Sequence, residues 1–253
     1  MKFNINLNMK FNIKKICFFI LFTCLFITLC YNILNKLKQT EDVLVYSTPI
    51  TNKVVVIDAG HGLPDAGASG FYGTTEQAIN LSIALKLQQI VEQSGAKVYI
   101  TRSDENGIYS LDANTIREKK ISDSKNRVEI GNESDADIFV SIHLNKFPAS
   151  SSYKGWQTFY QKNNENSKLL AELVQENLNK NINEESKRKT LPISNVYIME
   201  KVEIPTIIVE CGFLSNEEET KKLKDEKYQN KLAWGIYLGI QDYFYKKEVE
   251  NNG

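Results

Sequence analysis

The chain has 253 residues, of which 42% are apolar and 25% are charged, and its 31 basic residues balance its 31 acidic ones. This composition is typical of a globular protein with a sizeable core, and it gives no indication of nucleic-acid binding. Three of the four cysteines lie in one apolar stretch near the N-terminus. The rest of the chain has a single cysteine and no internal disulfide, so it must be stabilised by its own core.

An apolar segment near the N-terminus predicts a membrane helix. Residues 16–31 contain no charge, and three lysines lie among the six residues that precede them. The length approaches the roughly 20 residues that span a bilayer. Signal peptides have the same layout, but no small-x-small cleavage motif follows, and nothing amphipathic indicates a core helix. We expect residues 1–35 to be an uncleaved signal anchor that leaves the following domain exported, with a cleaved signal as the alternative.

Polar residues at 36–52 predict a linker, and residues 53–247 predict one α/β domain. Strands and helices alternate in this region, which favours a twisted, mostly parallel sheet flanked by helices. Apolar, β-branched runs predict the strands, and apolar residues at helical spacing predict the helices. The strands are expected at 54–57, 97–101, 137–142, 156–160, 195–199 and 205–210, and the helices at 75–94, 122–134, 167–181, after 215 and at 227–245.

Two of the helices have predicted caps. Thr74 and Gln77 resemble a capping box before the first helix of the domain. Ser215 is the expected N-cap of a later helix, because acidic residues follow it. Glu76 falls in the first turn of its helix, where the helix dipole favours a carboxylate. Helix formation alone can explain Glu76, so a functional role needs further support.

Three chemically useful side chains stand at the ends of predicted buried strands. His61 follows the first strand in a turn rich in glycine, His143 follows a second strand, and Glu210 ends a third. The two histidines are the only ones in the chain. Proteins of the α/β class place ligands at this edge of the sheet. An ionised, unpaired carboxylate buried there costs several kcal/mol, which a nearby metal ion would offset.

Two imidazoles and a carboxylate form a known ligand set for catalytic zinc, with the fourth position open to water. Zinc lowers the pKa of that water to roughly 7, and a further carboxylate can take up the proton. Glu76 and Glu210 are the two carboxylates available. The spacing alone does not decide the matter, because an isolated histidine beside glycines is usually a turn or surface residue. Cys211 has no evident base beside it and is expected to be a core residue.

Several segments, in the same order, resemble the zinc-dependent N-acetylmuramoyl-L-alanine amidases of the amidase-3 type. The resemblance covers about residues 53–245. The segments are IDAGHG at 57–62 with DAGA at 65–68, TR at 101–102, NR at 126–127, ADIFVSIHLN at 136–145 and PTIIVECGFLSN at 205–216.

The resemblance implies that His61, Glu76 and His143 bind one zinc ion and that Glu210 is the catalytic base. It implies hydrolysis of the amide between N-acetylmuramic acid and L-alanine of the peptidoglycan stem peptide. Asn145 also matches the family and is expected near the substrate.

A narrower resemblance connects the anchor and residues 209–216 to spore amidases. These enzymes strip peptides from cortex peptidoglycan, and the bared muramic acid is then converted to muramic-δ-lactam in preparation for germination. The alternatives are a vegetative cell-wall amidase, a zinc peptidase that cuts within the stem, and a non-catalytic wall-binding protein. No inserted inhibitory helix is evident, so any control is expected to come from an activating partner protein. Arg127 is expected to be structural, on a helix.

Overall fold

The computed structural model describes residues 13–39, 48–182, 186 and 188–252. Its contacts divide the chain into two units, Met1–Tyr46 and Ser47–Gly253. The predicted linker at 36–52 lies partly outside the described residues, as does the start of the predicted anchor.

The first unit contains one helix, α1 (Ile13–Gln39), within its described part. Its segment Cys17–Leu34 has a mean hydropathy of 2.3 and is long and apolar enough to cross a membrane. A signal sequence near an N-terminus has the same properties. The anchor at residues 1–35 therefore stays a prediction.

The second unit is built on a six-stranded sheet with the order β2-β1-β3-β6-β4-β5. The four strands β2, β1, β3 and β6 are parallel, whereas β4 is antiparallel to β6 and parallel to β5. The predicted α/β domain with a mostly parallel sheet is confirmed. The strands are β1 (Val54–Ala59), β2 (Lys97–Ile100), β3 (Ile138–Asn145), β4 (Gln157–Gln161), β5 (Leu191–Ile193) and β6 (Thr206–Phe213).

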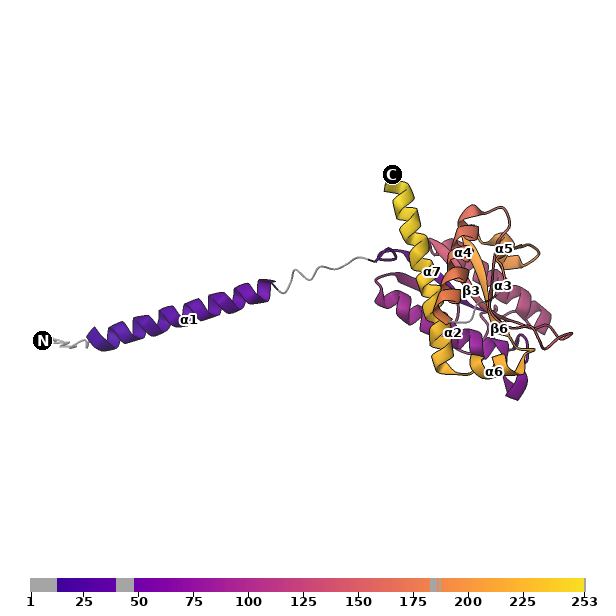
Figure 1. Ribbon diagram of the computed structural model, residues 1–253, viewed down its shortest axis with the longest axis horizontal. Coiled ribbons are helices and arrows are strands. Elements are labelled where there is room, and N and C mark those ends of the chain that lie inside the picture. Colours follow the sequence, from indigo (N-terminus) through magenta and orange to yellow (C-terminus); the bar gives the residue numbers. More distant parts are fainter. Residues whose placement is uncertain (1–12, 40–47, 183–185, 187, 253) are drawn as a thin grey trace, which may run out of the picture. The chain divides into compact units, whose positions relative to one another are not determined.

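Helices cover both faces of this sheet (Figure 1). On one face α7 packs against α2 and α4, and on the other α3 packs against α5. The short 3-10 helix η1 (Phe71–Gly73) precedes α2. The helices of the second unit are α2 (Glu76–Gln93), α3 (Ile116–Glu133), α4 (Glu165–Ile182), α5 (Tyr197–Lys201), α6 (Glu217–Leu223) and α7 (Glu226–Asn252).

The central strands β1, β3 and β6 are buried on both faces, which explains why they read as continuous apolar runs rather than alternating ones. The larger core cluster lies between the sheet and α2, α4 and α7. A smaller cluster, which includes Val56, Phe139 and Val202, lies on the α3 and α5 face. Because the three central strands are parallel neighbours, their carboxyl ends meet at one edge of the sheet, where the polar residues gather.

Two predicted elements differ from the structure. The strand expected at 195–199 is wrong, because this segment enters the helix α5, while β5 forms just before it and was not predicted. A short apolar run does not distinguish a strand from a helix, and Pro192 hides the edge strand. The third helix α3 begins at Ile116 rather than at 122, since Thr115 and Glu118 form a capping box.

Both predicted caps are also wrong. The N-cap of α2 is Thr75, which makes no side-chain cap hydrogen bond, and the backbone carbonyls of Ala66 and Ala68 accept from the first amides instead. The N-cap of α6 is Asn216, whose side chain accepts from the amide of Glu219. At α2 the preceding loop provides the contacts of the first amides, and the sequence pattern does not contain them. At α6 the cap is local and lies one residue later than expected.

Candidate metal centre

The turn after β1 places His61 at the edge of the sheet in an unusual backbone conformation. The φ angle of His61 is 63°, in the left-handed region that residues other than glycine rarely adopt. Such a conformation costs about 1–3 kcal/mol and persists only where the surroundings enforce it. The neighbouring residues therefore have to hold this turn in place.

Two buried arginines bind three successive carbonyl groups of the turn. Arg102 donates from Nε to the carbonyl of Ala59 (2.8 Å) and from Nη2 to that of Gly60 (3.1 Å). Arg127 donates to the carbonyls of Ala59 (2.8 Å) and His61 (2.5 Å). Hydrogen bonds from charged donors contribute about 1.5–3 kcal/mol each, so together they can offset the strain at His61.

The Arg127 guanidinium also forms a buried ion pair with Asp58 on β1. The Asp58 carboxylate accepts further hydrogen bonds from Thr101 and Ser141, and it is fully buried. Burial raises the pKa of Asp58, but Arg127 and the two hydroxyls outweigh it and hold the pKa below its ordinary value. Arg127 lies on a helix, as expected, and connects α3 to the turn that carries His61.

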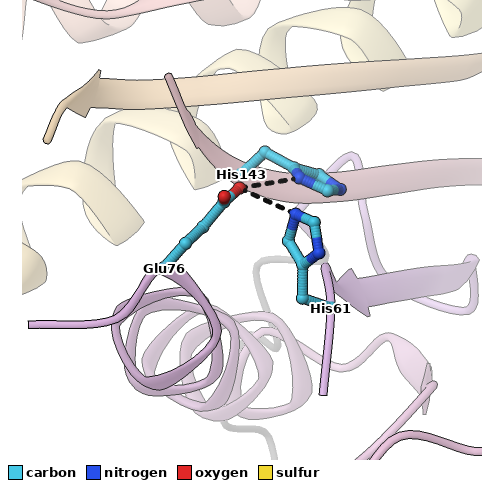
Figure 2. Close-up of side chains that lie close together, drawn as sticks. All are labelled: His61, Glu76 and His143. Carbon is cyan, nitrogen blue, oxygen red and sulfur yellow. Dashed lines mark hydrogen bonds and ion pairs between the residues drawn. The ribbon is translucent and has the colours of Figure 1, made fainter. Parts of the chain in front are cut away.

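The structure brings His61, Glu76 and His143 together from three different elements (Figure 2). His61 comes from the turn after β1, Glu76 is the first residue of α2, and His143 lies on β3. One ligand atom from each lies within 4.8 Å of the other two. Oε1 of Glu76 lies 3.1 Å from Nε2 of His61 and 3.0 Å from Nδ1 of His143. Among the described residues, no other group of three or more histidine, cysteine or acidic side chains lies close enough together to hold a metal ion.

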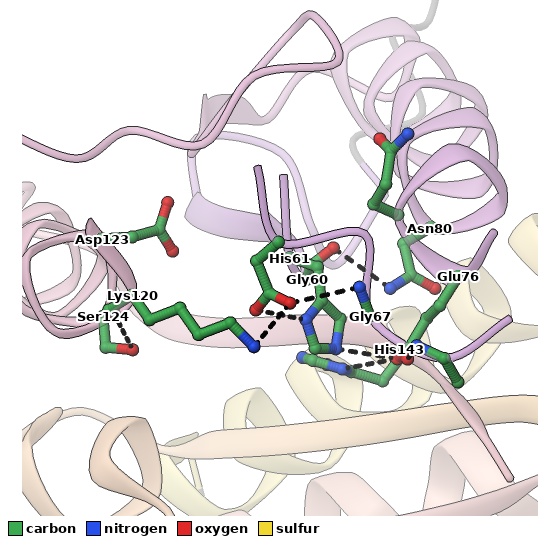
Figure 3. A network of polar contacts seen from close by, with 12 residues as sticks. Gly60, His61, Gly67, Glu76, Asn80, Lys120, Asp123, Ser124 and His143 are labelled. Carbon is green, nitrogen blue, oxygen red and sulfur yellow. Dashed lines mark hydrogen bonds and ion pairs between the residues drawn. The ribbon is translucent and has the colours of Figure 1, made fainter. Parts of the chain in front are cut away.

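A carboxylate outside this group orients His61. Oδ2 of Asp65 lies 3.0 Å from Nδ1 of His61, and Nζ of Lys120 lies 2.8 Å from Oδ1 of Asp65 (Figure 3). A ligating histidine usually donates its second ring N–H to such a carboxylate, which leaves the other nitrogen free for the metal. Here that other nitrogen is Nε2, the atom that faces Glu76.

The electrostatic surroundings of the imidazole favour a positive charge. Burial lowers the pKa of His61, but the hydrogen bonds to Asp65 and Glu76 outweigh it and raise the pKa to about 9. Burial likewise raises the pKa of Glu76, but the two histidines outweigh it and hold that pKa well below its ordinary range. A site that attracts a proton this strongly also attracts a metal cation, which would take the place of that proton.

Two glycines allow the three side chains to approach each other. A Cβ on Gly60 would lie 2.3 Å from Nε2 of His143, and one on Gly67 would lie 2.6 Å from Oε2 of Glu76. Gly67 also has a φ of +67°, which a larger residue rarely adopts. The glycine-rich turn is thus required by space as well as by conformation.

Glu210 lies on β6 directly beside His143, its register partner on β3. Its Oε2 is buried and has no hydrogen-bond partner among the described residues. Burial raises the pKa of Glu210 to about 7, and the neighbouring Glu76 raises it while the histidines lower it. An unpartnered buried carboxylate oxygen is costly, so its retention here indicates a role for a cation, water or substrate.

A cavity of about 340 Å³ opens beside these groups, and His61, His143 and Glu210 line it. One wall is polar and the other is mostly apolar, which suits part of a peptide or an amino sugar. The polar wall includes Tyr109, Lys119, Lys120 and Ser124, and the apolar wall includes Phe159, Ile193, Val196 and Tyr197.

Two other residues singled out in the sequence lie outside this cavity. Asn145, at the end of β3, is not among the described residues that line it, and its carbonyl accepts from the amide of Leu214 (2.9 Å). Cys211 is fully buried, and burial together with Glu210 raises the pKa of its thiol. Cys211 is therefore an unreactive core residue.

The residues that support the centre were not predicted from the sequence. Asp65 and Arg102 both lie within motifs that carry the family resemblance, but their residue types and spacing do not predict a role for them. Asp65 follows His61 by four residues, which is the available signal for a contact in the same turn. Nothing local in the sequence connects Arg102 to the carbonyls of residues 59 and 60.

The fold and the site define an α/β domain with a candidate metal centre of two histidines and one glutamate beside an unpartnered acid. Residues 55–242 match the family described as N-acetylmuramoyl-L-alanine amidase. The chain belongs to this family, which confirms the prediction that it is a peptidoglycan amidase.

Three similar proteins give the comparison its detail. The chain is 33% identical over 222 residues to the germination-specific N-acetylmuramoyl-L-alanine amidase of Bacillus subtilis strain 168, which covers 88% of this chain and 92% of the relative. A solved structure of the CwlD amidase from Clostridioides difficile, in complex with the GerS lipoprotein, is 45% identical with a TM-score of 0.73. The matched region covers 76% of this chain and 98% of the CwlD chain. The catalytic domain of the CwlV amidase from Paenibacillus polymyxa is 34% identical with a TM-score of 0.65, at 76% and 97% coverage.

Proposed function

We propose that this amidase removes stem peptides from spore cortex peptidoglycan, by hydrolysing the amide between N-acetylmuramic acid and L-alanine with the help of one zinc ion. The observation that carries the proposal is the convergence of His61, Glu76 and His143 beside the unpartnered Oε2 of Glu210. The germination-specific relative and the CwlD structure support the cortex as the setting. Removal of the peptide is the step that would allow muramic-δ-lactam formation.

The donor set fits zinc, and His61, Glu76 and His143 would hold it. Two imidazole nitrogens and one carboxylate oxygen are ligands that zinc prefers, and three protein ligands are typical of a catalytic site. When bound, zinc supplies a Lewis acid that polarises the amide carbonyl and lowers the pKa of water. Asp65 keeps His61 in the orientation and tautomer that point Nε2 into the site.

Glu210 would be the general base and then the general acid. Its Oε2 faces no competing donor, so it can accept a proton from the attacking water. The same carboxyl group can then deliver that proton to the nitrogen of L-alanine as the amide bond breaks. The cavity beside Glu210 has room for the reacting segment of the substrate.

The cellular arrangement is part of the proposal. Residues 1–35 would anchor the chain in the membrane, residues 36–52 would be a linker, and residues 53–247 would be the catalytic domain on the exported side. The apolar segment Cys17–Leu34 supports the anchor. The solved complex of CwlD with a lipoprotein supports an activating partner protein of that kind.

Product analysis tests the proposed reaction. Full-length protein in detergent, loaded with zinc, is incubated with defined muropeptides, alone and with a candidate lipoprotein partner. We expect intact stem peptides and peptide-free muramoyl glycan in the mass spectrum. Shortened stems would identify a peptidase instead, and the absence of any product under all conditions would indicate a non-catalytic protein. Faster release from vegetative wall than from cortex would contradict the cortex assignment.

A further inference from the structure

Arg188 lies on a platform of aromatic side chains at the same sheet edge as the metal centre. Its Cζ atom is 4.4 Å from the ring centre of Phe213 and 5.1 Å from that of Tyr153. These two rings stack with centroids 5.9 Å apart. Nη1 of Arg188 donates to Oε1 of Gln157 at 3.3 Å. We call Tyr153, Gln157, Arg188 and Phe213 the Arg188 subsite.

The guanidinium of Arg188 retains unused hydrogen-bonding capacity. Among the described residues it forms no ion pair, and Nη2 has no hydrogen-bond partner. Nε makes one long contact, 3.5 Å from the carbonyl of Lys154. A guanidinium that is stacked on rings and fixed at one nitrogen presents a rigid fork, which matches the geometry of a carboxylate. Lys120, on the polar wall of the cavity, is already paired with Asp65.

The sheet places this fork close to the proposed base. Gln157 on β4 is the direct register partner of Glu210 on β6, and residues directly opposite in an antiparallel pair have side chains on the same face. Arg188 thus contacts the residue that is paired with Glu210 across the two strands. One residue of extended peptide spans about 3.3–3.6 Å, so a ligand whose first amide lies at Glu210 reaches the subsite within its next few residues.

We propose that the Arg188 subsite binds a carboxylate of the stem peptide and so selects stems with free acids over amidated stems. This inference rests on the proposed function, because it takes the amide at Glu210 to be the first bond of the stem. The stacked guanidinium binds the carboxylate through two parallel N–H···O bonds, and Gln157 fixes its orientation. The subsite determines which stem is accepted, and it takes no part in proton transfer.

The test compares two substrates that differ only in charge. Full-length protein, wild type or Arg188→Ala, is given muramoyl tripeptides in which every stem carboxylate is either free or converted to a carboxamide. We expect the wild type to prefer the free acid by roughly 10- to 100-fold in kcat/KM, in line with a charged bidentate hydrogen bond. In Arg188→Ala the ratio should fall to near one, and Arg188→Lys should give an intermediate ratio because it keeps charge but loses the fork.

A matched control separates recognition from general charge and from folding. Lys189→Ala removes one positive charge from the adjacent, exposed side chain and should keep the wild-type ratio. If Arg188 only stabilises the conformation of its own segment, Arg188→Ala would lower kcat/KM for both substrates equally and preserve the ratio. That result would overturn the proposal, as would a wild-type ratio near one.

Binding measurements make this inference independent of turnover. Titration calorimetry on Glu210→Gln, with Arg188 either present or replaced by Ala, compares the affinities for the acid and the carboxamide peptides. A preference for the acid that disappears with Arg188 supports the subsite even if no cleavage is found, in which case only the proposed reaction fails. Equal affinities for both peptides refute the subsite even if the chain proves to be an amidase.

Discussion

The two sides of the sheet edge that carries the candidate metal centre differ in how completely their polar groups are satisfied. On the side of β1 and α3, Asp58, Asp65 and Arg127 all have partners, and the turn carbonyls are bound by arginines. On the side of β4 and β6, Oε2 of Glu210 and Nη2 of Arg188 have no partner among the described residues. The satisfied side holds the proposed metal ligands in place, and the unsatisfied side contains the two groups for which we propose roles in proton transfer and substrate binding.

The largest effect is expected on the unsatisfied side, from Glu210→Gln. This change keeps the size of the side chain but removes its ability to take up a proton. We expect kcat to fall by about 10²- to 10⁴-fold, because general acid–base assistance has that magnitude. Metal content, measured by atomic emission on the purified variant, should stay at about one zinc per chain. Normal turnover in this variant would exclude Glu210 as the base.

On the satisfied side, Asp58→Asn should affect folding rather than chemistry. It removes the fully buried carboxylate partner of Arg127 and leaves only the ion pair with Asp123 on the same helix, and breaking a buried pair costs about 3–5 kcal/mol. We expect this loss in the free energy of unfolding from denaturant titration. A loss below about 1 kcal/mol would show that the pair does little to hold α3 to the turn.

The same carboxylate predicts a pH dependence of stability. Because the folded pKa of Asp58 lies below its ordinary value of 3.8, its contribution is fully present above pH 3.8 and is lost as the pH falls through the folded pKa. Wild-type stability should therefore fall in acid more steeply than that of Asp58→Asn. If the free energies of unfolding of the wild type and Asp58→Asn fell in parallel between pH 5 and pH 2, the depressed pKa of Asp58 would be contradicted.

A smaller effect, on metal affinity, is expected from Asp65→Ala. Loss of the carboxylate that orients a ligating histidine typically weakens metal binding by about 10- to 100-fold. Competition with a chromophoric chelator measures this change. Lys120→Ala is the control, since it removes only an exposed ion pair to the same carboxylate and should change the affinity far less. Equal effects of the two variants would argue against the orienting role.

The smallest effect is expected at the start of α6. Asn216→Ala removes the N-cap acceptor and should cost about 1 kcal/mol, or about 2–4 °C in Tm for a domain of this size. Ser215→Ala should cost less, because among the described residues that hydroxyl accepts from the amide of Phe147 and not from an amide of α6. If Ser215→Ala were the more damaging change, the cap would lie where the sequence pattern placed it.

The convergence of the site could be predicted because it follows from sheet topology. His143 and Glu210 each end a buried parallel strand and His61 follows one, and the carboxyl ends of such strands meet at one edge. The strands themselves were visible as β-branched runs without alternation. The prediction that Glu76 binds the same ion as the two histidines depends on the family resemblance, because the position of a carboxylate at a helix start is sufficiently explained by the helix itself.

Most of the errors and omissions share one physical origin. The start of α2 at Thr75 depends on the loop whose carbonyls accept from its first amides, and the helix at 197–201 packs against α3. Arg102 and Arg188 act on atoms more than twenty residues away in the sequence. Local propensity contains no information about such approaches, so they become visible only in three dimensions.

The left-handed turn at His61 has a consequence for metal exchange. Its bracing by Arg102 does not depend on an ion, and although burial and Arg127 lower the pKa of Arg102 to about 10, it remains charged at neutral pH. We expect this turn to keep its shape with and without a bound ion, because the arginines bind its backbone carbonyls and not the proposed metal ligands' side chains. Binding of a metal ion would then not carry the entropic cost of ordering this loop.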